Sequence, residues 1–374
     1  TALGCMLATS VTELVIYRFL GGLGIGIASI ISPMYLSEIS PSKIRGRMVS
    51  LYQMAITIGI LTIYLSNYYL LSVSQNSTVQ FGNGMLAHIF KDEVWRSMFG
   101  VGIIPAAIFL GLLMLIPESP RWLAEKGYMD KARNIYGKIR TESEANSEMQ
   151  EIKASVDLFR PGKSGSIFRE FRKPLFIGII LAFLVQFSGI TAVIYYGAKI
   201  FAMGNSGINQ AFSGQLFIGI INVIFTLVAI FVIDKSGRRP LIIAGAILSL
   251  VCHAFIGFFF YMGYTQSVWL VVFILLYTAT FAATYGPVFW TLISEIYPNK
   301  IRGKAMSIAA FANWVATALV AQMVPWMLEN ISPSGTFWLF GICSIPAIYI
   351  GIKVIPETKG KTLEELEHLW VQKK

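Results

Sequence analysis

The chain has 374 residues, of which 55% are hydrophobic and only 13% are charged, and its formal net charge is +10 at pH 7. Soluble domains carry roughly 25% charged residues, so this composition excludes an ordinary water-soluble globular protein. The excess of basic residues raises the question of a nucleic-acid partner, and the answer depends on where those residues lie.

Apolar runs of about 20 residues recur along the chain, the length that an α-helix needs to cross about 30 Å of hydrocarbon. Strands of a membrane barrel would alternate polar and apolar residues over about ten positions, and these runs do not. We therefore predict an all-α membrane protein in which a short stub precedes nine spanning helices. The predicted spans cover residues 17–36, 48–71, 97–116, 175–201, 211–233, 241–261, 268–293, 305–328 and 336–355.

Most of the 30 Lys and Arg residues lie at alternate ends of successive predicted spans. The opposite ends hold only Lys91, Arg96 and Lys199, and Arg18 lies inside a span. Because loops rich in Lys and Arg stay on the cytoplasmic side, the central loop and the C-terminus are predicted to be cytoplasmic. Basic residues divided among short loops do not form one contiguous basic surface, which argues against nucleic-acid binding. The expected surroundings of the chain are therefore the lipid bilayer.

A loop motif occurs twice, in residues 37–46 (Ser-Glu-Ile, then Pro, then Lys-Ile-Arg-Gly) and in residues 294–303. The repetition predicts two related halves, and because the loop joins the same kind of helix pair each time, the halves are parallel repeats. Three predicted spans lie between the central loop and the second copy, whereas only a stub precedes the first. We therefore expect about three further spans upstream, giving about twelve in the complete protein.

The predicted domains are the remainder of an N-terminal helical bundle, a cytoplasmic linker, a C-terminal six-helix bundle and a cytoplasmic tail. Their bounds are 1–116, 117–173, 174–356 and 357–374. Within the linker, residues 129–140 and 147–158 favour short amphipathic helices, and a flexible tether is the alternative.

Isolated polar and aromatic side chains interrupt the apolar spans. Such groups are costly in lipid and usually face a cavity or another helix. A sugar site needs amides that both donate and accept hydrogen bonds, and a flat ring that packs against the C–H face of the sugar. The alternative is that each amide only forms a hydrogen bond between two helices. The candidate substrate-binding residues are Gln53, Gln186, Thr191, Tyr195, Asn222, Trp290, Asn313 and Trp314.

Two predicted spans carry backbone breaks beside these groups, since Ser188-Gly189 follows Gln186 and Gly286-Pro287 precedes Trp290. Broken helices expose backbone groups to a central cavity. Gly and Pro are also frequent in membrane helices, so the breaks support the site without defining it.

Charged residues gather at the predicted cytoplasmic helix ends. Ion pairs that bridge helices when this side is closed, and part when it opens, bias a two-state equilibrium. The alternative is that these charges only set topology, because exposed pairs contribute roughly 0–1 kcal/mol. Since the whole loop is duplicated, we favour a cytoplasmic gate made of Glu38, Arg45, Asp234, Arg238, Arg239, Glu295 and Arg302.

Arg18 is an ion inside a predicted span and needs a partner. No acidic residue lies within the first predicted spans before Glu38, so the partner of Arg18 is expected upstream.

An enzyme would need a nucleophile and base or a metal cluster, whereas His88, His253 and His368 are dispersed and the three cysteines lack metal-ligand spacing. We therefore expect no enzyme activity, no metal and no cofactor.

Six motifs distributed over essentially the whole chain resemble those of the sugar porter family of the major facilitator superfamily, and the bacterial proton-coupled xylose symporters are the most similar members. The motifs are Arg-Phe-Leu-Gly-Gly (18–22), Pro-Glu-Ser-Pro-Arg (117–121), Gln-Phe-Ser-Gly-Ile (186–190), Asp-Lys-Ser-Gly-Arg-Arg (234–239), Gly-Pro-Val-Phe-Trp (286–290) and Pro-Glu-Thr-Lys-Gly (356–360). The resemblance implies two six-helix bundles that transport a xylose-like or glucose-like monosaccharide across a bacterial inner membrane by alternating access. By position it also implies sugar contacts for Gln53, Gln186, Asn222, Trp290 and Trp314, and outer closure by Tyr195.

The chain departs from these relatives at several positions. Val185, Thr191 and Asn313 replace amide side chains of the family, so the identity of the sugar is left open. Proton-coupled relatives place one acid in their first span, near the arginine that matches Arg18, and another where this chain has Gly102. The resemblance implies proton symport with Arg18 in the coupling site, and a facilitative sugar uniporter and a non-transporting sugar sensor are the alternatives.

Overall fold

The computed structural model describes residues 1–41, 43–75, 84–139, 145–146, 149–150, 172–202, 208–298, 301–361 and 365–366. Within these ranges all regular structure is helical. Nine helical segments of the described chain are long and apolar enough to cross a membrane, which confirms the predicted number. They are Val11–Ile39, Arg45–Gln75, Val94–Leu113, Arg172–Ile200, Ser213–Ser236, Arg238–Tyr261, Val268–Glu295, Arg302–Asn330 and Pro333–Lys353.

The N-terminal part consists of long helices joined by short ones. They are α1 (Ala2–Leu7), α2 (Val11–Ile39), α3 (Arg45–Gln75), α4 (Met85–Ala87), the π-helical turn η1 (His88–Asp92), α5 (Val94–Gly100) and α6 (Ile103–Leu113). Helix α2 begins before the predicted start at residue 17, because Ser10 caps it: the Ser10 Oγ accepts a hydrogen bond from the backbone N of Glu13 at 3.2 Å.

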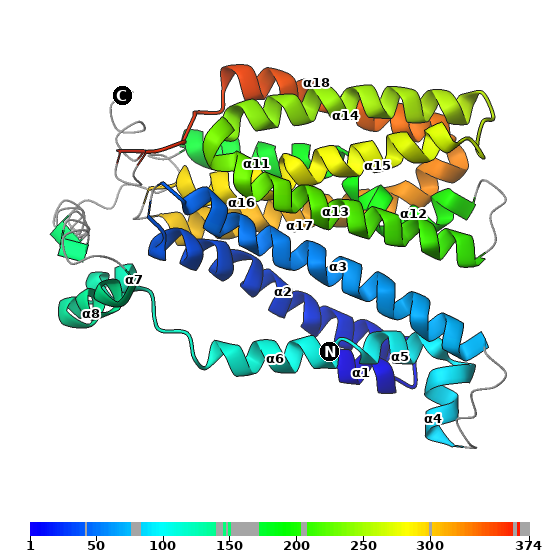
Figure 1. The fold of residues 1–374 in the computed structure, drawn as a ribbon, viewed down its shortest axis with the longest axis horizontal. Helices are drawn as coiled ribbons and strands as arrows, with labels where there is room; N and C mark the ends of the chain where they lie inside the picture. Colours follow the sequence, from blue (N-terminus) through cyan, green and yellow to red (C-terminus); the bar gives the residue numbers. More distant parts are fainter. Residues whose placement is uncertain are drawn as a thin grey trace.

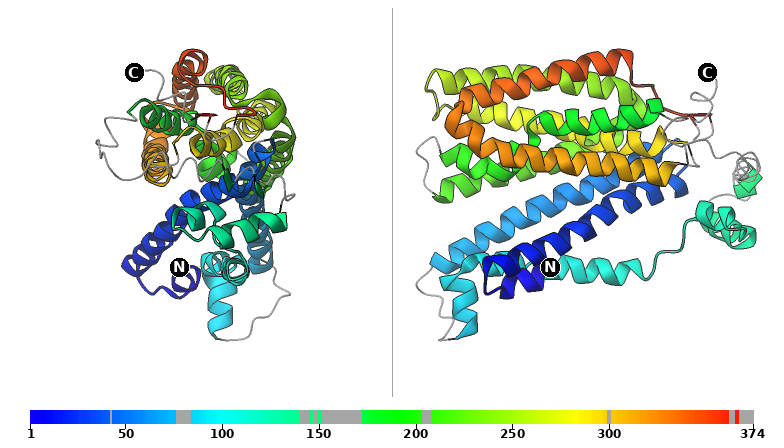
Figure 2. Two further views of the ribbon diagram at one scale, coloured as in Figure 1. Left: turned by 90° about the vertical axis from the view of Figure 1, so that its left-hand side faces the viewer. Right: turned by 180° about the vertical axis from the view of Figure 1, so that it is seen from behind.

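The C-terminal part is a bundle that holds most of the buried core. Its helices are α11 (Arg172–Phe187), α12 (Ile190–Ala202), α13 (Ile208–Ser236), α14 (Arg238–Tyr261), α15 (Val268–Ala283), α16 (Tyr285–Glu295), α17 (Arg302–Asn330) and α18 (Pro333–Lys353). Helices α14 and α18 lie side by side, and α2 and α3 cross the bundle obliquely, with α3 packed along α13 (Figure 1). In the end-on view of Figure 2, the N-terminal helices lie below the C-terminal bundle, and α3 lies against it.

Each of the two predicted backbone breaks lies in a different span and divides that span into two helices. The first falls at Ser188-Gly189, as predicted, and Gly189 has φ +92°, a conformation that favours glycine. The second break falls at Thr284 (φ −128°, ψ −83°), two residues before the predicted Gly286-Pro287. Pro287 instead stands in the first turn of α16, where a missing backbone N–H is tolerated.

The described residues of the duplicated loop make matching hydrogen bonds in the two halves. Ile44 N donates to Pro41 O at 3.1 Å, and Ile301 N donates to Pro298 O at 3.1 Å. Arg45 and Arg302 then begin α3 and α17, and both are buried. The predicted internal repeat is therefore confirmed at the level of individual hydrogen bonds.

The linker contains α7 (Pro120–Glu125) and α8 (Met129–Ile139), and α8 confirms the prediction for 129–140, while most of 147–158 lies outside the described residues. Both helices lie beyond the end of the bundle where α2 ends and α3 begins (Figures 1 and 2). Tyr136 OH donates to Glu38 O at 3.3 Å, and Tyr35 OH donates to Pro117 O at 2.9 Å. The linker is thus attached to the end of α2.

Candidate functional site

Three of the predicted substrate-binding residues are hydrogen-bonded to one another across the first helix break. The amide of Gln186 donates from Nε2 to Asn313 Oδ1 at 3.0 Å and accepts at Oε1 from Thr191 Oγ1 at 3.0 Å. Thr191 and Asn313 are buried, while Gln186 is half-buried. The set therefore joins α11, α12 and α17, and each amide keeps further donor and acceptor positions for a ligand.

Gln53 and Trp290 lie where α3 packs against α16. A Cβ placed on Gly286 would lie 3.1 Å from Gln53 Nε2, so the absence of a side chain there lets the amide approach α16. The ring of Trp290 meets Tyr52 edge-on, with ring centroids 5.1 Å apart. These contacts join a helix of the N-terminal part to one of the C-terminal part beside the second break.

Asn222 is 2% exposed, yet its Oδ1 has no hydrogen-bond partner among the described residues. One turn along α13, the Thr226 hydroxyl is likewise buried without a partner in the described part of the chain. Buried polar atoms are nearly always paired, so these oxygens are acceptors in need of a donor. Tyr195 and Trp314 are more open, at 56% and 36% exposed.

Arg18 is exposed and lies over an aromatic ring, with its Cζ 5.5 Å from the centroid of Phe99. Its predicted role in proton coupling stays a prediction.

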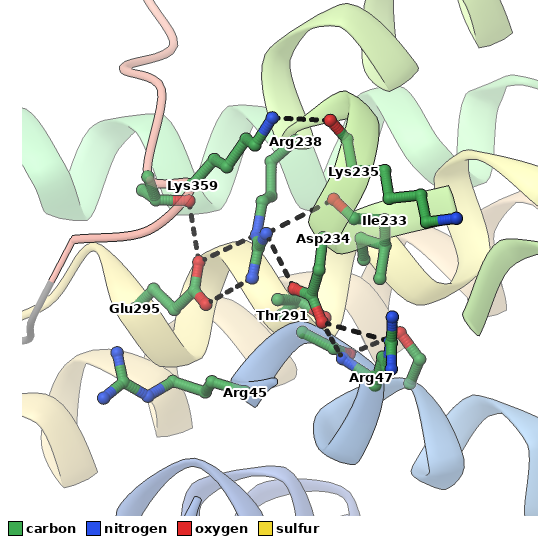
Figure 3. Close-up of polar contacts among 12 residues, drawn as sticks. Arg45, Arg47, Ile233, Asp234, Lys235, Arg238, Thr291, Glu295 and Lys359 are labelled. Atoms are coloured by element: carbon green, nitrogen blue, oxygen red, sulfur yellow. Dashed lines mark hydrogen bonds and ion pairs between the residues drawn. The ribbon is translucent and has the colours of Figure 1, made fainter. Parts of the chain in front are cut away.

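Arg238 is the centre of the predicted gate and is only 1% exposed. It donates from Nη2 to Glu295 Oε1 at 2.8 Å and from Nε to Glu295 Oε2 at 3.1 Å, and its Nη1 lies 3.0 Å from Asp234 Oδ1 (Figure 3). The guanidinium thus binds one carboxylate in a fork and a second one end-on. We call the end of the molecule defined by Arg47, Asp234, Arg238, Glu295 and Glu357 the charged end.

One gate contact joins the two parts of the chain. Asp234 Oδ2 accepts from the backbone N of Arg47 at 3.0 Å, in the first turn of α3, where a helix attracts negative charge (Figure 3). A Cβ on Gly46 would overlap Asp234 and Arg238, so glycine is needed for this approach. Sequence analysis missed Arg47 and Gly46 as gate residues, although both lie in or next to the duplicated loop.

Glu357 was also missed, although it lies in a motif that carried the family resemblance. Its two carboxylate oxygens accept from the backbone N of Arg238 at 3.0 Å and of Arg239 at 3.1 Å, which caps the start of α14. The preceding Gly237 has φ +89°, and a Cβ there would lie 2.5 Å from Glu357 Oε2. Only glycine fits between the cap and the helix.

Two further gate residues bind backbone carbonyls near the Arg238 network. Arg45 donates from Nε to Ser37 O at 3.2 Å and from Nη1 to Lys361 O at 3.4 Å. Arg239 binds the last turn of α18 through the carbonyls of Gly351 and Ile352. The predicted gate is therefore one buried network with neighbouring helix caps.

Glu38 and Arg302 line a groove of about 760 Å³ between α2, α6 and the start of α17. Its walls contain none of the predicted substrate-binding residues. Farther along α3, Tyr64 OH donates to Ile194 O in α12 at 2.7 Å. The two parts of the chain are thus in contact at the charged end and again in the second half of α3.

The fold defines a polytopic helical membrane protein of the major facilitator type, and the comparisons agree. The family described as "Sugar (and other) transporter" matches residues 1–370. The arabinose-proton symporter of Bacillus subtilis is 37% identical, over 100% of this chain and 78% of its own. The D-xylose-proton symporter of Escherichia coli is 40% identical, over 97% and 73%. This chain belongs to the sugar transporter family of the major facilitator superfamily.

Two solved structures match this chain to different degrees. The proton:xylose symporter bound to 6-bromo-6-deoxy-D-glucose matches with a TM-score of 0.85, at 40% identity, over 97% of this chain and 75% of its own. The inward open conformation of the Escherichia coli xylose transporter matches with a TM-score of 0.68, at 39% identity, over 96% and 73%. At nearly equal identity, the backbone of this chain is therefore more similar to the sugar-analogue-bound structure than to the inward open one.

Proposed function

We propose that the protein moves a monosaccharide across a membrane by alternating access, in symport with protons. The observation that carries this proposal is the set of Gln186, Thr191 and Asn313 at a helix break, because two amides and a hydroxyl match the mixed donors and acceptors of sugar hydroxyls. Membership of the sugar transporter family supports it.

The substrate is a neutral sugar of pentose or hexose size, with xylose the first candidate. All eight candidate binding residues are uncharged, so a permanently charged solute would lack a counter-charge. The unpaired Oδ1 of Asn222 supplies a further acceptor, and Trp290 supplies a flat ring. The relatives named for xylose, arabinose and galactose symport support this substrate class.

The charged end serves as the cytoplasmic gate of a bacterial inner-membrane protein, and its contacts are those expected of a closed gate. The contact between Asp234 and the start of α3 holds the two parts together there, and the Arg238 network keeps the carboxylate in place. Residues 1–116 and 174–356 move as two bundles joined by the linker 117–173, with the tail 357–374 on the cytoplasmic side. Opening requires the Asp234 contact to part, so its strength biases the two-state equilibrium.

Proton coupling involves Arg18, which lies inside a span. A cation at this depth needs an acidic partner, and such an acid exchanges its proton only with the side to which the cavity is open.

Uptake of radiolabelled xylose, arabinose and glucose into proteoliposomes tests the proposal, with the full-length protein and with its Gln186→Ala variant. We expect accumulation above the outside concentration under an inward proton gradient, abolished by a protonophore and strongly reduced in the variant. Equilibration that ignores the gradient would identify a uniporter. Absence of uptake of all three sugars would reject sugar transport.

A further inference from the structure

The break between α11 and α12 deprives several backbone carbonyls of their helical donors, and those of Val185 and Ser188 are among them. In an unbroken helix, Val185 O would accept from Gly189 N and Ser188 O would accept from Ala192 N. Here Gly189 N donates to Gln186 O at 3.1 Å and Ala192 N donates to Gly189 O at 3.1 Å. The carbonyls of Val185 and Ser188 therefore need other donors, because the segment is buried.

The first carbonyl is satisfied locally, since Ser188 Oγ donates to Val185 O at 2.7 Å. The second break uses the same device, because Thr284 Oγ1 donates to Thr280 O at 2.6 Å. The carbonyl of Ser188 is satisfied differently. Its donor is Tyr277 OH at 2.6 Å, from the middle of α15, so the first break depends on a side chain of another helix.

Tyr277 is fully buried, and its ring packs against His253 of α14 with ring centroids 4.3 Å apart. His253 Nδ1 lies 2.7 Å from Ser249 O, which holds the imidazole in place. A Cβ on Gly189 would lie 2.8 Å from the ring of Phe340, so the glycine of the break packs closely against that ring. The break is thus held by a phenol that binds its carbonyl and by a ring that packs on its glycine.

Gln186 and Thr191 stand on either side of this break and are hydrogen-bonded to each other across it. A shift of the backbone at Ser188 changes their separation, because they belong to different helices. We propose that Tyr277 is a positioning residue for substrate recognition: its hydroxyl fixes the broken backbone and thereby sets the Gln186–Thr191 pair at the spacing that the sugar requires. This inference rests on the proposed function, since it takes that pair to contact the sugar.

The variant Tyr277→Phe tests this inference because it removes only the hydroxyl. Tyr297→Phe is the matched control, since Tyr297 is equally buried and its hydroxyl has no hydrogen-bond partner within the described ranges. In the full-length protein we expect Tyr277→Phe to raise the Kd for xylose about three- to tenfold, the effect of one lost hydrogen bond, while Tyr297→Phe leaves it unchanged. In proteoliposomes the KM should rise while the maximal rate is retained.

A double variant separates positioning from general damage. In the Gln186→Ala background the pair is already lost, so adding Tyr277→Phe should change the Kd less than twofold if Tyr277 acts through Gln186. Faster hydrogen exchange at residues 189–193 in Tyr277→Phe, without sugar, would report the loosened break directly. An unchanged Kd and unchanged exchange in Tyr277→Phe, or full additivity with Gln186→Ala, would overturn the inference. Failure of the wild type to bind any sugar would instead overturn the proposed function.

Discussion

The hydroxyl of Thr358 donates to Oε2 of Glu295 at 2.7 Å. In the other half, the hydroxyl of Ser119 donates to Oε2 of Glu38 at 2.6 Å. Each hydroxyl follows a Pro-Glu pair, at 117–118 and 356–357, and each glutamate lies in one copy of the duplicated loop. The internal repeat therefore includes a hydrogen bond from a later segment of the same half, which the loop sequences alone do not reveal.

The two hydroxyls differ in burial, so their removal should have different effects. Thr358 is 1% exposed and its acceptor Glu295 2%, whereas Glu38 is half-buried. Thr358→Val should destabilise the protein by about 1–3 kcal/mol, because a hydrogen bond to a buried carboxylate is lost. Ser119→Ala should cost less, since water replaces the donor. Melting temperatures of both variants in detergent check this, and equal losses would contradict it.

Removing the negative charge of Glu295 should weaken the closed charged end. Glu295→Gln leaves the buried Arg238 with only Asp234 as an ionic partner among the described residues, and breaking a buried pair typically costs about 3–5 kcal/mol. We expect a lower melting temperature and faster labelling of a cysteine introduced at the charged end.

Glu329→Gln is the matched control for that variant. Its partner Lys199 is 46% exposed and Glu329 itself 67%, so this pair should contribute only about 0–1 kcal/mol. Equal losses of stability in the two variants would show that burial does not govern these ion pairs.

A side chain at Gly46 should force the two parts apart at the charged end. The Cβ of Gly46→Ala would overlap Asp234 and Arg238, whereas a Cβ on Gly59 of the same helix meets nothing within 4 Å. Gly46→Ala should favour the inward open state and slow transport. Gly59→Ala should be neutral or stabilise α3 by about 0.5–1 kcal/mol. Spin-label distances across the charged end report the shift, and identical distances in both variants would contradict it.

Replacing Asn222 by an apolar residue should raise the stability of the protein and lower its affinity for the sugar. The Asn222 Oδ1 is buried without a partner among the described residues, so Asn222→Leu removes an unsatisfied acceptor and should stabilise the sugar-free protein by about 1 kcal/mol. The same change removes a donor and an acceptor from the proposed site and should raise the Kd for xylose at least about tenfold. Calorimetric titration and thermal melting of one preparation test both parts, and loss of stability together with unchanged affinity would contradict them.

Much of the candidate site could be predicted because its signals are local. An amide in an apolar span, such as Gln186, and a glycine near it are visible in the sequence, and the structure joins Gln186 to Thr191 and Asn313. The second break was placed two residues too late, because Gly286-Pro287 marks a helix start as readily as a helix end. Tyr277 was not singled out, since a tyrosine in an apolar span carries no local mark of its hydrogen bond to Ser188.

The sequence by itself determined the membrane environment, the spans and the internal repeat, because these follow from run length, periodicity and repetition along the chain. Only the tertiary structure decided which charges and hydroxyls are partners. Arg238 binds Glu295 and Asp234, Glu357 caps α14, and Tyr277 reaches Ser188 across 89 positions of the chain. Such pairings depend on how helices distant in sequence pack together, since a buried polar group takes the partner that lies within about 3 Å after packing, whatever its position in the sequence.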